Sequence, residues 1–257
     1  TEPKWTVDPA KGAKRASAPS IEVAGETATI NGTVSWVPDL PGTDVLVVVG
    51  TTGDGSPVAA VVESGAAGVS IEAVKSFDAT RSLGHLTLTG ATGKVLSAAS
   101  DDVAGAWYLA HGLIAAESLG AVETALETSV AYAKERYTFG RAIGSYQAIK
   151  HELAEILRQL ENSRSLMYYA GWARQDAPDE FPLAASAFRS AAGNAVDFAS
   201  RAQINVHGGI GATWEHDAPL YFRRAQVSRR LLAGTSDATD RVADEVLNAA
   251  RAEAAAA

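Results

Sequence analysis

The sequence predicts an α+β protein in which a small β-sandwich or barrel is followed by an antiparallel helical bundle. Residues 20–98 are rich in Val, Thr, Gly and Ile, with turn residues about every ten positions, a pattern typical of short strands in an all-β unit. After Ser100 the apolar residues recur three and four positions apart over long stretches, as they do on one face of a helix. We therefore expect a β domain at 1–100 and a helical domain at 101–257.

Strands are expected where short apolar runs lie between turn residues. The stretch 28–37 is expected to form two short strands around Asn31-Gly32, a dipeptide typical of tight hairpin turns. The other expected strands are 45–49, 58–63, 70–74 and 85–89.

Five helices are expected in the second half of the chain, joined by short links that favour an antiparallel bundle. The first follows the candidate cap Asp101-Asp102, and the last begins after Gly234 with Thr235 or Ser236 as its cap. The apolar stripes are explained as bundle core. The expected helices are 101–136, 145–174, 182–206, 218–232 and a C-terminal helix from 235 onward.

Composition excludes several classes of protein. The 257 residues suffice for two modest domains with buried cores, and 47% apolar with 20% charged residues are values of a globular protein. The sequence has no cysteine, which excludes disulfides and thiolate chemistry. The net charge of −8 argues against a general nucleic-acid binder. The five scattered histidines and the lack of an HExxH or GxSxG motif argue against a metal enzyme and a serine hydrolase.

Three short stretches stand out, although each also has a purely structural explanation. Arg136-Tyr137-Thr138-Phe139-Gly140 continues to Gln147 and fits the end of one helix and the start of the next. His207-Gly208-Gly209-Ile210-Gly211 offers bare backbone N–H groups to a pyrophosphate, or simply stops a helix. Ala233-Gly234-Thr235-Ser236-Asp237 fits a turn before a capped helix.

Taken in order, these stretches resemble the acyl-CoA dehydrogenase family. The order is R-x-x-F-G-x-x-I-x-x-x-Q, then G-G-x-G, then G-T-S, on helices that follow a small β unit. Asn31-Gly32 with Trp36, and Thr1-Glu2-Pro3, are similar to further family motifs. The resemblance covers the middle β domain and the C-terminal helical domain of the family, which is nearly all of this chain.

The resemblance implies FAD-dependent oxidation of the Cα–Cβ bond of an acyl-CoA thioester, in which a glutamate removes the α-proton and FAD takes the β-hydride. In the family FAD lies across a subunit interface, where a helical bundle holds the ADP half and a middle domain holds the flavin ring. The resemblance therefore assigns to the ADP half of FAD the residues Arg136, Thr138, Phe139, Gln147, Gly208, Gly209, Gly211, Thr235 and Asp237.

Both family positions for the catalytic glutamate are alanine in this sequence. They are Ala233, just before the G-T-S turn, and Ala110, in the first long helix, which is followed by His111 where many members have arginine. Glu117 lies about 10 Å along the helix from Ala110, and Glu215 follows the glycine-rich stretch. The flavin side also departs from the family, because Pro38 replaces a flavin-contacting threonine and Lys4-Trp5-Thr6 replaces a G-x-G-S-D motif.

We therefore expect one subunit of a heteromeric acyl-CoA dehydrogenase, an α2β2 heterotetramer, whose partner supplies the catalytic glutamate and the flavin pocket. Such split enzymes resemble those of actinobacteria that shorten steroid side chains as CoA thioesters. The family implies an acceptor of the electron-transfer flavoprotein type, and we expect a cytoplasmic location. The alternatives are a scaffold subunit without FAD, and a self-sufficient homo-oligomeric flavoenzyme that uses Glu117 or Glu215 as its base.

Family members carry a further helical domain before the T-E-P strand, whereas this sequence begins at that strand. We therefore expect either a fragment of a longer protein or a subunit that has dispensed with this domain. The sequence does not begin with methionine, which favours a fragment of a longer protein.

Overall fold

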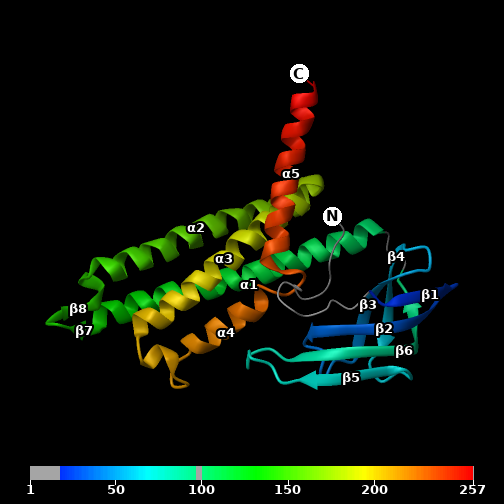
Figure 1. Cartoon of the computed structure of the whole chain (residues 1–257), viewed down its shortest axis with the longest axis horizontal. Coiled ribbons are helices and arrows are strands. Elements are labelled where there is room, and N and C mark those ends of the chain that lie inside the picture. The colour runs from blue at the N-terminus through cyan, green and yellow to red at the C-terminus, as the bar shows by residue number, and fades with distance from the viewer. Residues whose placement is uncertain (1–17, 97–99, 257) are drawn as a thin grey trace. The chain divides into compact units, whose positions relative to one another are not determined.

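A computed structural model describes residues 18–96 and 100–256. They fall into two compact units (Figure 1). The first extends to Trp107 and takes in Leu231–Ala233, and the second comprises Tyr108–Arg230 and the chain from Gly234. Helix α1 passes through residue 107 without a break, so the boundary near residue 100 stays a prediction.

The first unit is a closed β-sheet, as the sequence predicts. Its strands pair in the order β2-β1-β3-β4-β6-β5, and a further β2–β6 pairing closes the sheet so that β5 lies outside the ring. Ile21, Ile30, Val48, Val62 and Leu86 are among the residues of its buried core. The strands are β1 (Ser20–Ala24), β2 (Thr27–Pro38), β3 (Val45–Thr51), β4 (Pro57–Glu63), β5 (Val69–Val74) and β6 (Leu83–Val95).

The hairpin expected at Asn31-Gly32 is wrong, because β2 runs straight through this dipeptide. The register between β2 and β6 shifts at this point, which is a β-bulge. The Asn31 side chain accepts a hydrogen bond from the Gly90 N–H at 2.7 Å. Gly32 has φ = 142°, and a Cβ there would lie 2.9 Å from the Pro19 Cα. Asn31-Gly32 thus lies at a bulge and lets the backbone at Pro19 approach β2 closely, instead of forming a turn.

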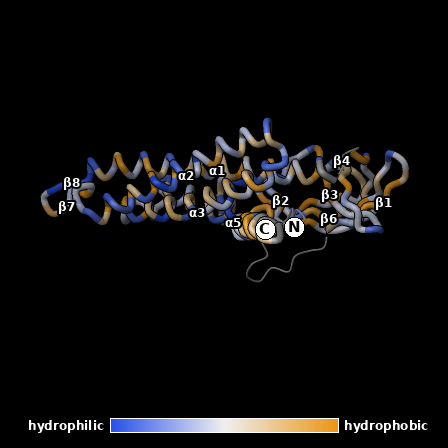
Figure 2. Tube along the Cα trace, turned by 90° about the horizontal axis from the view of Figure 1, so that it is seen from above, coloured by the Kyte–Doolittle hydropathy of each residue, from blue (hydrophilic) through white to orange (hydrophobic). Residues whose placement is uncertain are grey.

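The second unit is the expected antiparallel bundle, with α3 (Phe181–His207) in contact with α2 (Gln147–Asp176), α4 (Ala218–Ser228) and α5 (Gly234–Ala256). Alanines supply much of the buried surface of α3, and α1 (Ser100–Glu135) adds Leu119 and Val122 to the same core. Hydrophobic positions recur along α1, α2 and α3 (Figure 2).

Three helix boundaries differ from the prediction. Residues 143–145 form a separate 3-10 turn, η1 (Ile143–Ser145), so α2 begins at Gln147. Helix α4 ends at Ser228 and not near residue 232, because Leu232 and Ala233 have φ of 52° and 65°, which no α-helix accommodates. Thr235 lies inside α5 and does not cap it. None of the helices among the described residues is both long and apolar enough to cross a membrane.

Candidate functional site

The first of the three stretches forms a small hairpin between α1 and α2. Strands β7 (Tyr137–Thr138) and β8 (Arg141–Ala142) pair across a turn in which Phe139 and Gly140 have φ of 49° and 80°. For a residue other than glycine, such as Phe139, this left-handed conformation costs about 1–2 kcal/mol of conformational free energy. The Phe139 ring is nevertheless 94% exposed. Phe139 thus lies in solvent although its backbone conformation is unfavourable for a residue with a side chain.

Contacts at its base hold this hairpin in place. The Tyr146 hydroxyl donates to the Thr138 carbonyl at 3.2 Å, and the Arg141 guanidinium lies 3.9 Å from the centre of the Tyr146 ring. The Ile143 N–H donates to the Arg136 carbonyl at 2.8 Å. The Arg136 and Gln147 side chains are exposed on either side of the hairpin, so both are accessible to a ligand.

The second stretch ends α3 and continues into the 3-10 turn η3 (Ile210–Ala212). Gly208 has φ = 65° and its N–H donates to the Ile204 carbonyl at 2.9 Å, which closes the helix. A Cβ on Gly211 would lie 2.8 Å from the Ile204 oxygen, so packing explains that glycine. Gly209 has neither a positive φ nor any atom within 4 Å of an added Cβ. Neither backbone conformation nor packing within the chain therefore requires glycine at this position.

The structure brings these two stretches to the same end of the bundle. Tyr132, in the last turn of α1, stacks on His207 with ring centres 4.5 Å apart, and the Gln203 amide donates to the Thr128 hydroxyl at 2.9 Å. Arg136 lies four positions after Tyr132, and Tyr132 contacts His207, the last residue of α3. Sequence analysis did not find this contact, because it joins positions far apart in the chain.

His207 is the centre of this junction. Its Nδ1 lies 2.8 Å from the Gln203 carbonyl oxygen, and its ring centre is 4.3 Å from that of His216. The His216 Nδ1 accepts the Ala218 N–H at 3.0 Å. Burial lowers the pKa of His207, the bond to the Gln203 carbonyl opposes this, and the neighbouring His216 lowers it further. The neutral ring is therefore the form that fits here.

The third stretch does not join the other two within one chain. Thr235 packs against Gly193 of α3, and the fifteen residues from Gly193 to Gly208 span about 22 Å of helix. The Thr235 N–H and hydroxyl both donate to the Arg229 carbonyl at 3.0 Å. The Asp237 carboxylate accepts from Arg241 Nε at 2.9 Å. Both of these predicted cofactor residues therefore have internal partners.

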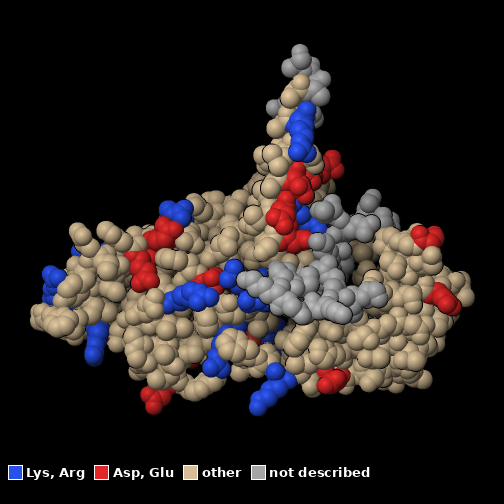
Figure 3. Space-filling view, in the orientation of Figure 1, with Lys and Arg blue, Asp and Glu red and all other residues tan. Residues whose placement is uncertain are grey.

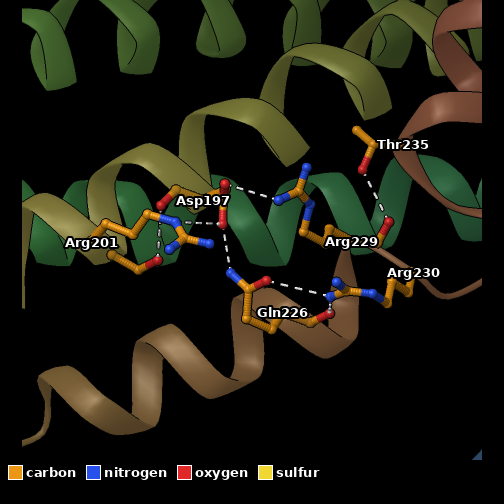
Figure 4. Close-up of polar contacts among 7 residues, drawn as sticks. Asp197, Arg201, Gln226, Arg229, Arg230 and Thr235 are labelled. Atoms are coloured by element: carbon orange, nitrogen blue, oxygen red, sulfur yellow. Dashed lines mark hydrogen bonds and ion pairs between the residues drawn. The ribbon is translucent and has the colours of Figure 1, made fainter. Parts of the chain in front are cut away.

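Asp197 of α3 binds Gln226 of α4 and Arg229 directly after it, and sequence analysis missed this residue (Figure 4). Its carboxylate lies 2.8 Å from Arg229 NH1 and accepts bonds from Gln226 at 2.5 Å and Arg201 at 3.2 Å. Burial alone would raise the pKa of Asp197, but the Gln226 bond and the charges of Arg229 and Arg201 hold it below its usual range. The Arg229 side chain thus ties α4 to α3 while its carbonyl fixes Thr235.

The two alternative bases differ in their surroundings. Glu117 has both carboxylate oxygens engaged, since Arg224 NH2 donates to one at 2.8 Å and the Ser228 hydroxyl donates to the other at 2.9 Å. Glu215 is exposed in the loop before α4. Ala110 is half-buried and Ala233 is buried.

In the β unit, the tryptophan of the N-G-x-x-x-W motif lies at the second register shift between β2 and β6. Trp36 has φ = 61°, its N–H donates to His85 Nδ1 at 3.3 Å, and the two rings meet edge to face with centres 5.0 Å apart. Pro38 ends β2 opposite Leu83. Thr1-Glu2-Pro3 and Lys4-Trp5-Thr6 lie outside the described residues. Among the described residues, no three His, Asp or Glu side chains gather as metal ligands do.

Comparison with known proteins bears on both units. Residues 108–247 match the family model for the acyl-CoA dehydrogenase C-terminal domain. The acyl-CoA dehydrogenase IpdE2 of Mycobacterium tuberculosis is 41% identical over 134 residues, which are 52% of this chain and 40% of IpdE2. The acyl-CoA dehydrogenase FadE34 of the same organism is 35% identical over 217 residues, which are 84% of this chain and 29% of FadE34. The chain thus spans well under half of these relatives.

Solved structures match nearly the whole chain. A structure described as a Tcur3481-Tcur3483 steroid ACAD variant has a TM-score of 0.84 and 27% identity, and the match covers 96% of this chain and 67% of that one. The ChsE4-ChsE5 complex from Mycobacterium tuberculosis has a TM-score of 0.81 and 26% identity, over 94% of this chain and 65% of that one.

Proposed function

Because the chain belongs to the acyl-CoA dehydrogenase family, we propose that it is one subunit of a heteromeric, FAD-dependent enzyme that oxidises the Cα–Cβ bond of an acyl-CoA thioester. A heteromer is supported by the structural similarity to the ChsE4-ChsE5 complex. A steroid side-chain CoA ester is the proposed substrate, since a steroid ACAD variant shares the fold and 27% of the sequence. An acceptor of the electron-transfer flavoprotein type and a cytoplasmic location complete the proposal.

The exposed end of the bundle fits the ADP half of FAD. Arg136 offers a charge-assisted hydrogen bond to a phosphate, and the exposed backbone of Gly209 suits the same anion, whereas the Gly208 N–H is used to close α3. Phe139 offers an uncovered ring for stacking on a flat base. When bound, FAD supplies the hydride acceptor. The single observation that carries the assignment is this pairing of an exposed, strained Phe139 with an exposed glycine loop at one end of the bundle.

The partner subunit supplies the proton acceptor in this proposal. A base must reach the α-proton with a free carboxylate, but the two family positions, Ala110 and Ala233, carry no ionisable group. Glu117 accepts from both Arg224 and Ser228, so using it as a base requires breaking contacts that hold α4 against α1. Each heterodimer therefore has one working site, with the ADP half on this chain.

A scaffold subunit without FAD is the second candidate. The observation that favours it is the internal use of Thr235 and Asp237, whose polar groups bind Arg229 and Arg241. Under that alternative the exposed hairpin contacts protein instead of cofactor.

Flavin content of the assembled protein separates these functions. We expect the complex purified with its partner to contain one flavin per heterodimer, and Arg136→Ala to lose most of its yellow absorbance. Arg158→Ala is the matched control, because Arg158 is an exposed arginine of α2 that pairs with Glu155 away from the hairpin. Undiminished flavin in Arg136→Ala would favour the scaffold. Stoichiometric flavin and acyl-CoA oxidation by the isolated chain would establish the self-sufficient enzyme instead.

A further inference from the structure

Helix α5 is packed at one end and uncovered at the other. Ala238 and Arg241 are buried near its start, where it crosses α3. The side chains described from residue 243 onward are exposed, and α5 extends away from the other helices of its unit (Figure 1). We call residues 243–254 the α5 arm.

The arm has the composition of a contact surface and not of a solvated helix. Val246 and Leu247 are 58% and 52% exposed. A helix of this length without tertiary contacts is marginal in water. A protein surface packed against the arm would therefore stabilise its helical conformation and remove its apolar side chains from water.

The spacing of the arm residues is that of a short coiled-coil seam. Ala243, Leu247, Ala250 and Ala254 are separated by four, three and four positions, so they fall on one stripe of the helix. Three of the four are alanines, and small side chains allow two helices to approach closely. The stripe thus suits a helix as its partner.

The charges beside this seam identify the occupant. Asp244 and Arg251 flank it on the same side, seven residues apart. In space, acidic side chains lie toward the base of α5 and a basic one toward its tip (Figure 3). In an antiparallel pair, this flank of one helix faces the same flank of the other. Asp244 of each copy then meets Arg251 of the other, which forms two symmetric ion pairs.

We infer that the α5 arm binds the α5 arm of a second copy of this chain, antiparallel about a twofold axis. A parallel pair is disfavoured, because Asp244 and Arg251 would then face Thr239 and Val246 of the copy and gain no charge pair. A self-complementary contact of this kind closes at two copies. The inference rests on the proposed function only for the presence of two copies in the α2β2 assembly.

Charge reversal tests this arrangement. We expect Asp244→Arg and Arg251→Asp each to weaken self-association of the full chain by about tenfold, since each replaces two attractive pairs by repulsive ones. The double reversal restores opposite charges and should return the dissociation constant to the wild-type value. Glu245→Arg is the matched control, because this exposed carboxylate lies one position further around the helix, off the seam. Sedimentation velocity over a concentration series measures all four variants and the wild type.

Two outcomes overturn the inference. One is a chain that stays monomeric alone and is present once per assembly with its partner. The other is a double reversal that is as weak as the single ones, which means that the arm binds a different protein. Leu247→Asp should also weaken association, and a matching midpoint of thermal unfolding shows that it folds. Self-association of the chain, together with an assembled complex that contains no flavin, would refute the proposed function and leave this inference standing.

Discussion

Replacing Gly193 by alanine tests the contact that positions the G-T-S turn. A Cβ at this position of α3 would lie 3.0 Å from the Thr235 hydroxyl oxygen and 3.3 Å from its Cβ, and closer still to its methyl group. The added Cβ would overlap with the Thr235 methyl group more closely than side chains in proteins ever do. Helix α3 and the first turn of α5 must therefore move apart. Gly193→Ala therefore perturbs Thr235 without touching any exposed residue of the proposed site.

The expected loss follows from three contributions. Overpacking a tight site costs about 1–3 kcal/mol, and weakening the bond from Thr235 to the Arg229 carbonyl costs about 0.5–1.5 kcal/mol. Alanine returns about 0.5–1 kcal/mol of helix propensity. The free energy of unfolding should thus fall by about 0.5–4 kcal/mol, with a central value of about 2 kcal/mol, and each kcal/mol lowers the midpoint of thermal unfolding by about 2–4 °C.

Thermal unfolding followed by circular dichroism is the assay, with two companion variants. Gly171→Ala is the control, because Gly171 is an exposed helical glycine with nothing within 4 Å of an added Cβ; its midpoint should rise. Thr235→Ser removes the clashing methyl and keeps the hydroxyl, so combining it with Gly193→Ala should recover most of the loss. A Gly193→Ala variant as stable as Gly171→Ala, or a loss that Thr235→Ser leaves unchanged, would refute this account of the packing.

Two further predictions concern His207 and Glu117. The pKa of His207 is held below its ordinary value by burial, so its neutral form stabilises the fold above about pH 6.5. That stability is lost as the pH falls below this value, and thermal unfolding of wild type should depend more steeply on pH between 7 and 5 than that of His207→Gln; equal slopes would exclude this role. Glu117→Gln should lower stability by about 1 kcal/mol through loss of the Arg224 charge pair, while turnover of the assembled enzyme stays within a few-fold. A fall in turnover of a thousandfold or more in a folded variant would identify Glu117 as the base.

The helices were predictable because their signal is local and repeated. The pattern of α1 continues to Glu135, within one residue of the expected end. The errors arose where a distant contact decides the backbone. Asn31-Gly32 favours a turn by its local preference, yet β2 pairs with β6 on both sides of it, and Pro19 lies against Gly32. Strand β1 was not among the expected strands, because its five residues bury only Ile21.

The same distinction applies to the candidate site. Phe139, Gly208 and Gly209 were found from sequence because each belongs to a contiguous motif. Asp197 was not, since its bonds to Arg229 and Gln226 join α3 to α4 across about thirty residues. A single aspartate in a helix carries no local mark of such a role.

The three motifs also differ in how much of each remains accessible to a ligand, and this difference shows which motifs are the stronger candidates for binding. Phe139 is exposed although its positive φ is unfavourable. Neither packing nor a positive φ within the chain requires glycine at position 209. Thr235, by contrast, is consumed in holding the start of α5. The contacts within the bundle do not explain the first two features, whereas the third serves stability directly. We therefore propose that a cofactor or a partner binds at the exposed hairpin and the glycine loop, and not at the G-T-S turn.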